Sequence, residues 1–202
     1  MQPQKITHTF DFKIYRGKEI AEIINQLAQL RIEVFKEYPY LYDGTIAYEE
    51  DYLSRYLNIK DSFVLMLFDN QNAIGATTAA PLEDEREDFR LPFEKSGLDV
   101  SKIFYFGESV LLPKYRGMKL YRNFMQEREN AARAHGTKLC AFFSVKRPDN
   151  HVLKPKNYQD LTPIWNYYGF IEHPEIEAWY SWKDINKKEA TRKPFSAWIK
   201  TC

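Results

Sequence analysis

The sequence predicts an α/β fold, and two observations support this prediction. Short apolar or alternating segments, typical of strands, are interspersed with segments whose apolar residues recur at i, i+3, i+4 and i+7, the spacing of an amphipathic helix. The chain has 202 residues without a repeat or a low-complexity linker, which suits one domain with a substantial core.

The first part of the chain predicts a strand followed by two helices. Residues 6–15 alternate loosely between apolar and polar side chains, as a strand does. Apolar residues recur at helical spacing from Ile20 to Val34, so we expect a helix there. One buried face of that helix should consist of Ile20, Ile23, Ile24 and Leu27. An aromatic loop at 38–44 precedes a shorter helix expected at 48–57.

The remainder alternates strands and helices around one irregular segment. Apolar segments at 63–68 and 73–79 flank a turn of Asp and Asn residues, which predicts a hairpin. Residues 81–102 begin acidic and contain Pro and Gly, so we expect an irregular insertion with one short helix. The elements expected after it are a strand ending near 112, a helix at 116–135, a strand at 138–145, a helix at 158–168 and a strand at 176–182.

Composition excludes several classes of function. The 29 Lys and Arg residues nearly balance 28 Asp and Glu, which gives no electrostatic case for nucleic acid or an anionic membrane. With only Cys140 and Cys202 we expect no disulfide framework, and no Cys/His spacing predicts a metal site. The N-terminus lacks an apolar signal core, and no apolar run approaches the roughly 20 residues of a membrane span. We therefore expect a cytoplasmic protein.

The segment from Phe104 to Asn130 is the most informative. An apolar and aromatic strand ends at Pro113, and Arg116-Gly117 opens a helical run. A strand that passes through a Gly-containing turn into a helix leaves backbone N–H groups unpaired at the helix start, where the macrodipole favours negative charge. Such a junction is suited to a phosphate or pyrophosphate.

This segment resembles the acetyl-CoA-binding motif of the GNAT acyltransferases, in which a strand, a Pro-x-Tyr-Arg-Gly turn and a helix hold the pyrophosphate. The resemblance implies a single GNAT-like domain over residues 1–202, a central mixed sheet flanked by helices, and acetyl-CoA as co-substrate. It implies cofactor contacts from Arg116, Gly117, Met118, Lys119, Leu120, Tyr121 and Arg122. Lys119 and Tyr121 depart from the Gly and Gly/Ala of the motif. A helical backbone at 119 would tolerate any side chain, and Lys119 would add positive charge near phosphate, whereas the bulk of Tyr121 would crowd the helix against the sheet or the cofactor.

By the same resemblance, the strand before the turn supplies both backbone and side-chain groups. A β-bulge there would free the main chain of Val110, Leu111 and Leu112 to hold the cofactor arm. Glu108 would act as the base that deprotonates the acceptor ammonium. The competing interpretation is that Glu108 faces solvent or pairs with an arginine.

The acceptor site and the late helix are less fully specified. The resemblance places the aromatic loop at the acceptor cleft, so Tyr40 and Tyr42 are expected to contact substrate. Residues 49–51 either attract a cation or form a solvated acidic helix start. Trp165 stands where the family often has a tyrosine acid and is expected to be core, and Asn157 is a candidate cofactor contact.

These features predict acetyl transfer from acetyl-CoA to a primary amine of a small molecule or peptide. Two alternatives stay open. Lys119, Tyr121 and Trp165 favour a degenerate domain that binds acyl-CoA without turnover. Leu30-Arg31-x-x-Val34-Phe35 resembles the first helix of autoinducer synthases, although the sequence alone does not assemble the acidic and arginine constellation that such an acyltransferase needs. A homodimer is compatible with each of these.

Overall fold

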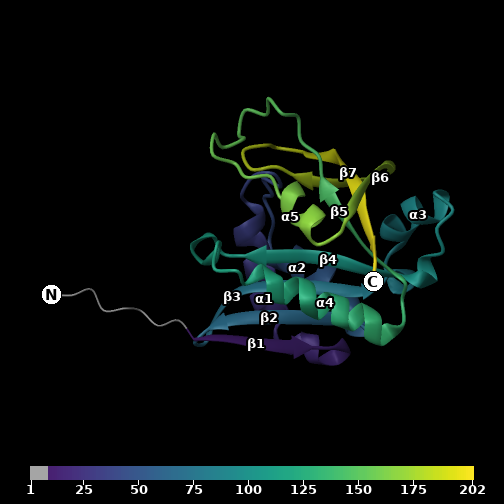
Figure 1. Cartoon of the computed structure of the whole chain (residues 1–202). Coiled ribbons are helices and arrows are strands. Elements are labelled where there is room, and N and C mark those ends of the chain that lie inside the picture. The colour runs from purple at the N-terminus through teal and green to yellow at the C-terminus, as the bar shows by residue number, and fades with distance from the viewer. Residues whose placement is uncertain (1–8) are drawn as a thin grey trace.

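The computed structural model describes residues 9–202, which form a seven-stranded sheet in the order β1-β2-β3-β4-β5-β7-β6 (Figure 1). Only β4 and β5 pair in parallel, so the sheet is mixed. The strands are β1 (Phe10–Tyr15), β2 (Phe63–Asp69), β3 (Asn72–Pro81), β4 (Ile103–Leu111), β5 (Leu139–Val145), β6 (Ile171–Lys183) and β7 (Ala190–Thr201). The α-helices are α1 (Ile24–Phe35), α2 (Ile46–Ser54), α3 (Glu87–Lys95), α4 (Tyr121–His135) and α5 (Thr162–Tyr167).

Helices cover both faces of the sheet at β1–β4, as the packing of the β2 side chains shows. Phe63, Leu65 and Leu67 pack in the cluster that contains α4, whereas Val64 and Met66 pack against α1 and α2. Successive side chains of a strand point to opposite faces, so a strand that is apolar throughout must be covered on both sides. The hairpin predicted from residues 63–68 and 73–79 is confirmed, since β2 pairs antiparallel with β3.

The buried face expected for the first helix is confirmed, except that one of its four residues is only partly buried. Ile20, Ile23 and Leu27 are buried, and Ile24 is partly buried against the same cluster. The helix is not continuous, because residues 17–22 form a 3₁₀ turn before α1 begins. The aromatic loop and α2 follow as predicted, and α2 starts two residues earlier than expected.

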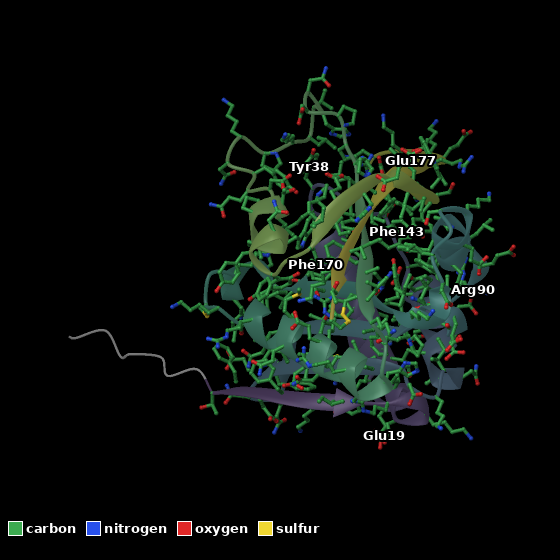
Figure 2. All side chains as sticks on the ribbon, turned by 45° about the vertical axis from the view of Figure 1, so that its right-hand side comes forward. Glu19, Tyr38, Arg90, Phe143, Phe170 and Glu177 are labelled. Atoms are coloured by element: carbon green, nitrogen blue, oxygen red, sulfur yellow. A yellow bond between two sulfur atoms is a disulfide. The ribbon has the colours of Figure 1, made fainter. Side chains whose placement is uncertain are left out.

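The segment 81–102 is more ordered than an irregular insertion. Its single α-helix, α3, buries Phe89 and Phe93 in a cluster shared with β5, β6 and β7. In Figure 2, Phe143 of β5 lies in the interior, and Arg90 of α3 lies toward the edge. This insertion therefore covers one face of the second half of the sheet.

Three boundaries and one element differ from the sequence prediction. Helix α4 begins at Tyr121 rather than at 116, α5 is shorter than 158–168, and β6 is longer than 176–182. Strand β7 was not predicted at all, although it lies between β5 and β6. It contains Pro194, a residue that normally argues against a central strand. Proline is tolerated here because the ladder with β5 ends at Phe195.

The expectation of no disulfide is wrong. Cys140 packs in the core as predicted, but it is bonded to Cys202, with the two Cα atoms 5.9 Å apart. Cys140 pairs with Lys200 across β5 and β7, so adjacent strands bring the two sulfur atoms together. Within residues 9–202 no cluster of His, Cys, Asp and Glu could hold a metal ion. None of the helices in that range is long and apolar enough to cross a membrane.

The sheet opens between β4 and β5. These strands pair only where Ile103–Tyr105 lies beside Leu139–Ala141. Beyond that point β4 continues along β3 to Leu111, and β5 continues along β7 to Val145. Figure 1 shows the two strands running apart, which divides the molecule into a lower half (β1–β4) and an upper half (β5–β7).

Candidate active site

A β-bulge in β4 lies beside this opening. The pairing of β3 with β4 shifts between Thr77 and Ala79, so Gly107 and Glu108 together oppose Thr78. The Thr78 hydroxyl accepts from the Glu108 N–H at 3.1 Å and so replaces a ladder bond. A Cβ on Gly107 would lie 2.4 Å from Thr78 Oγ1 and 2.6 Å from Tyr56 Oη, so a side chain does not fit there.

The bulge changes the direction in which Glu108 points. Phe104 and Phe106 pack on the α4 side of β4, and strict alternation would place residue 108 on that side as well. Instead, Glu108 contacts Arg31 of α1, and Val110 packs in the α1 and α2 cluster. The extra residue therefore turns a carboxylate toward the two N-terminal helices.

Glu108 belongs to a buried charged cluster. Arg31 Nη1 lies 2.8 Å from Glu108 Oε2, and Arg31 Nε donates to Glu49 Oε2. Tyr42 donates its hydroxyl to Glu49 Oε1 at 2.6 Å. Glu49 thus uses both oxygens, whereas Glu108 Oε1 is buried without a hydrogen-bond partner among the described residues. The arginine pairing foreseen for Glu108 is present, and it occupies only one oxygen.

Burial and charge both act on this cluster. Burial alone would lower the pKa of Arg31, but the neighbouring Glu108, Tyr52 and Glu49 hold that pKa above its ordinary value. Burial raises the pKa of Tyr42, as does its hydrogen bond to Glu49. The arginine is therefore a permanent cation and Tyr42 a permanent hydrogen-bond donor near neutral pH.

Arg31, Tyr42, Glu49 and Glu108 of this cluster line a cavity of about 360 Å³. Its walls come from the aromatic loop, α1, α2, α3 and the strands on both sides of the opening. Tyr40 and Tyr42 line it, as the sequence predicts. Arg147 secures the loop by donating to the carbonyl oxygens of Pro39 and Tyr40, each at 2.8 Å, and to both oxygens of Asp184. This wall is thus tied to the β6–β7 half of the molecule.

The turn after β4 is the second part of the site. Gly117 has φ +78° and Lys119 has φ +62°, so the backbone at Lys119 is left-handed and not the right-handed helical one that tolerates any side chain. A left-handed backbone is the conformation that glycine adopts most readily, and glycine is the usual residue of the motif at that position. Lys119 therefore keeps a turn conformation that its side chain disfavours.

The surroundings of the turn fit a pyrophosphate. Four exposed cations surround it: Lys114, Arg116, Lys119 and Arg122. A Cβ on Gly117 would meet no atom within 4 Å, so the turn backbone faces open space. Arg116 pairs with Glu37 at 2.7 Å, but the pair is exposed and holds the guanidinium only weakly. Met118 is exposed as well, Leu120 is buried, and the ring of Tyr121 lies 6.0 Å from that of Tyr168.

The main chain of β4 faces the opening at Leu111. The Leu112 N–H donates to the Ile74 carbonyl at 2.9 Å, so it is occupied by β3. Alternate residues of an antiparallel strand direct their backbone groups to the same neighbour, so those of Leu111 point away from β3. The Leu111 carbonyl accepts from Arg116 Nε at 3.1 Å. Among the three residues expected to hold a cofactor arm, Leu111 has the favourable orientation.

The late helix supplies core rather than a proton donor. Trp165 packs against Phe142 and Trp198, with ring centroids 5.1 and 5.0 Å away, which confirms the core interpretation. Asn157 is exposed in the loop between β5 and α5, and no contact ties it to the turn.

Comparison with known proteins identifies the fold. No protein-family model matches the chain, and no curated protein matches its sequence. Solved structures do match: an acetyltransferase of the GNAT family from Streptococcus pneumoniae has a TM-score of 0.57 at 13% identity, covering 95% of this chain and 100% of its own. The chain has the GNAT fold.

Two further GNAT-fold structures agree over almost the whole length. An N-acetyltransferase from Staphylococcus aureus has a TM-score of 0.59 at 10% identity, covering 95% of this chain and 98% of its own. A candidate acetyltransferase from Salmonella typhimurium, solved with its cofactor acetyl-CoA, has a TM-score of 0.57 at 9% identity, covering 94% of this chain and 93% of its own. The recognition of a GNAT-like α/β fold from the β4–α4 segment is thus confirmed.

Sequence reasoning did not place Arg31 in the site, and it left Glu49 between a cation-attracting role and a solvated helix start. Glu49 is fully buried, so the solvated interpretation of residues 49–51 is wrong for this residue. A signal was present in the helical spacing. Arg31 lies four residues after Leu27 and four before Phe35, and Glu49 lies four before Leu53, so each charge shares a face with buried apolar residues.

Proposed function

We propose that this chain is an acyl-CoA-dependent N-acyltransferase that moves an acetyl group from acetyl-CoA to a primary amine. The observation that supports this most is the position of Glu108, which lines a cavity and follows the point where β4 and β5 cease to pair. A base, a cavity for an acceptor and a main chain free to hold a thioester arm are thereby next to one another.

The chain's own groups have separate roles in this proposal. The turn at residues 116–122, with its cations and left-handed backbone, holds the pyrophosphate of CoA. The Leu111 main chain lies beside the pantetheine arm, and its N–H faces the oxygen that becomes negative when the thioester is attacked. Glu108 takes the proton that makes the ammonium a neutral nucleophile. Arg31 and Glu49 hold Glu108 in position.

Two measurements test the proposal. Titration calorimetry of CoA on the wild type and on Arg116→Ala should give binding that the substitution weakens. Absence of binding at millimolar CoA contradicts the cofactor assignment, while equal affinity of the variant removes only the role of Arg116. Acetyl-CoA turnover with a mixed amine panel should release free CoA only when an amine is present.

A degenerate domain is the first competing function, and Lys119, Tyr121 and Trp165 favour it. Its result in the same assays is CoA binding without amine-dependent release of CoA. The left-handed backbone at Lys119 argues for a working cofactor site, because this conformation is the one glycine adopts most readily and glycine is the usual residue of the motif there.

An autoinducer-synthase-like acyltransferase is the second competing function. The pairing of Arg31 with Glu49 and Glu108 favours it, because this alternative needs an arginine beside acidic residues. A panel of acyl-CoA thioesters of increasing chain length separates the two enzymes. Faster transfer of a long acyl chain than of acetyl would replace the acetyltransferase proposal with this one.

A further inference from the structure

The charged groups of the cavity leave one place for a cation. Three carboxylates and two guanidinium groups line it, so negative charge is in excess by one. Arg86 and Asp88 form a two-bond ion pair with each other at 3.1 and 2.9 Å, and Glu49 is occupied by Arg31 and Tyr42. Glu108 Oε1 is the acceptor in this lining that has no partner among the described residues. A buried carboxylate oxygen that lacks a donor is costly and favours a ligand that supplies one.

The rest of the lining is mainly aromatic. Six parts of the chain contribute one ring each to the cavity lining: Phe35, Tyr40, Phe89, Phe143, Trp182 and Phe195. Phe89–Tyr180 and Tyr40–Trp182 ring contacts, at 5.2 and 5.9 Å, hold these walls together. Such walls remove an apolar body from water and offer few further polar partners.

We propose that the acceptor is a hydrophobic primary monoamine, with its ammonium at Glu108 Oε1 and its apolar body between the aromatic walls. This inference rests on the proposed function, of which it names the substrate class. One ammonium is expected because one carboxylate oxygen is free. A cavity of about 360 Å³ lies at the small end of ligand sites and suits a compact acceptor.

The reaction balances with these groups. Glu108 accepts one proton from the ammonium, and the freed nitrogen lone pair forms the C–N bond at the thioester carbonyl carbon. Collapse of the adduct breaks the C–S bond. The second nitrogen proton goes to the departing thiolate to give free CoA thiol, and Glu108 returns its proton to solvent. The products are an amide, CoA and one proton, without any oxidant or reductant.

The same geometry disfavours two other amine classes. The carboxylate of an amino acid beside Glu108 would need a free cation, but the buried Arg31 already pairs with Glu49 and Glu108, and the exposed Arg86 is held by two hydrogen bonds to Asp88. The second ammonium of a diamine would need a second free carboxylate or would lie unpaired against aromatic walls. Either group would have to be desolvated without a partner.

Calorimetry on the CoA-saturated wild type tests the proposal with four probes, of which phenethyl alcohol and phenylalanine each differ from phenethylamine by one group. Phenethylamine should bind at least about tenfold more tightly than phenethyl alcohol, phenylalanine or putrescine, a difference of about 1.4 kcal/mol or more. Glu108→Gln should remove that preference over the alcohol. The exposed Glu83→Gln is the matched control and should retain it. The wild-type comparison of amine with alcohol stands even if Glu108→Gln fails to fold.

The outcomes separate this inference from the proposed function. Faster acetylation of phenylalanine, putrescine or a lysine peptide than of phenethylamine overturns the acceptor class and leaves acyl transfer standing. Equal binding of phenethylamine and phenethyl alcohol overturns the role of Glu108 Oε1. Selective binding of phenethylamine without acetylation supports the ligand class and contradicts the transferase.

Discussion

At the scale of single residues, Glu49 and Glu108 have the same side chain but differ in how many carboxylate oxygens are hydrogen-bonded. Both pair with Arg31, but Glu49 also accepts from Tyr42, whereas Glu108 keeps one oxygen without a partner among residues 9–202. A carboxylate with both oxygens engaged is a poor proton acceptor for a ligand. The free oxygen is therefore what assigns the base role to Glu108 and the positioning role to Glu49.

Replacing Glu108 by Gln tests that assignment. The variant keeps the size of the side chain, so CoA affinity should stay nearly intact while turnover falls about 10²–10⁴-fold at neutral pH. The deficit should shrink as pH approaches the pKa of the acceptor amine, because more acceptor is then already neutral. Steady-state rates across pH, with Glu83→Gln alongside, provide the measurement. Wild-type rates at every pH would exclude Glu108 as base.

A second prediction at this scale concerns Lys119 and the free energy of unfolding. Its φ of +62° costs a non-glycine residue about 1–2 kcal/mol, which Gly avoids while losing about 0.5–1 kcal/mol through unfolded-state entropy. Lys119→Gly should therefore raise the free energy of unfolding by about 0.5–1 kcal/mol in denaturant titrations. Gly117→Ala, at φ +78° in open space, should lower it by about 1 kcal/mol. A destabilised Lys119→Gly would mean that the turn is not left-handed there.

At the scale of elements, the bulge in β4 links the fold to the site. Because Gly107 and Glu108 both lie opposite Thr78, the side-chain alternation of β4 shifts at the bulge. Phe106 therefore packs under α4, and Glu108 contacts α1. Without that extra residue the same sequence would direct the carboxylate into the apolar α4 cluster. The bulge in turn depends on Gly107, because its neighbours leave no room for a Cβ.

Gly107→Ala should accordingly affect stability and catalysis together. Atoms at 2.4 and 2.6 Å from the new methyl group must move, which we expect to cost about 1–3 kcal/mol in denaturant unfolding. Turnover should fall more than CoA affinity, since the displaced segment includes Glu108 while the turn at residue 117 is unaltered. A Gly107→Ala variant with wild-type stability and wild-type turnover would show that the bulge does not constrain Glu108.

Comparison of elements with the sequence shows what local pattern can predict. Periodicity placed α1, the β2–β3 hairpin and the β4–α4 junction, because each depends on side chains within a few residues of one another. The left-handed turn at Lys119 and the β7 strand around Pro194 were missed, because tertiary contacts override the local preference of both residues. The bulge, and with it the meeting of residues 31, 49 and 108, depends on pairing between distant strands, which spacing in the sequence does not encode.

At the scale of the whole molecule, the aromatic content has an electrostatic consequence. The sequence contains 14 Tyr, and several of them lie in the buried clusters around the cavity. Burial raises the pKa of Tyr56 and Tyr105 well above the ordinary value of 10.0, and it raises the pKa of Tyr158 to about 12. These phenols stay neutral in the folded protein at pH values at which they ionise in the unfolded chain.

This difference predicts loss of stability in alkali. Because the folded-state pKa is raised, the contribution is complete below about pH 10 and is lost as pH rises above it, where only the unfolded state releases protons. Each fully buried tyrosine should cost about 1.4 kcal/mol at about pH 11. Denaturant titrations at about pH 8 and pH 11 measure the loss, and Tyr105→Phe, which keeps the ring, should make it smaller. The contrary result is a full rise of tyrosinate absorbance while the near-ultraviolet circular dichroism stays native. The phenols would then ionise inside the folded protein, and the aromatic cavity would have to be open to water.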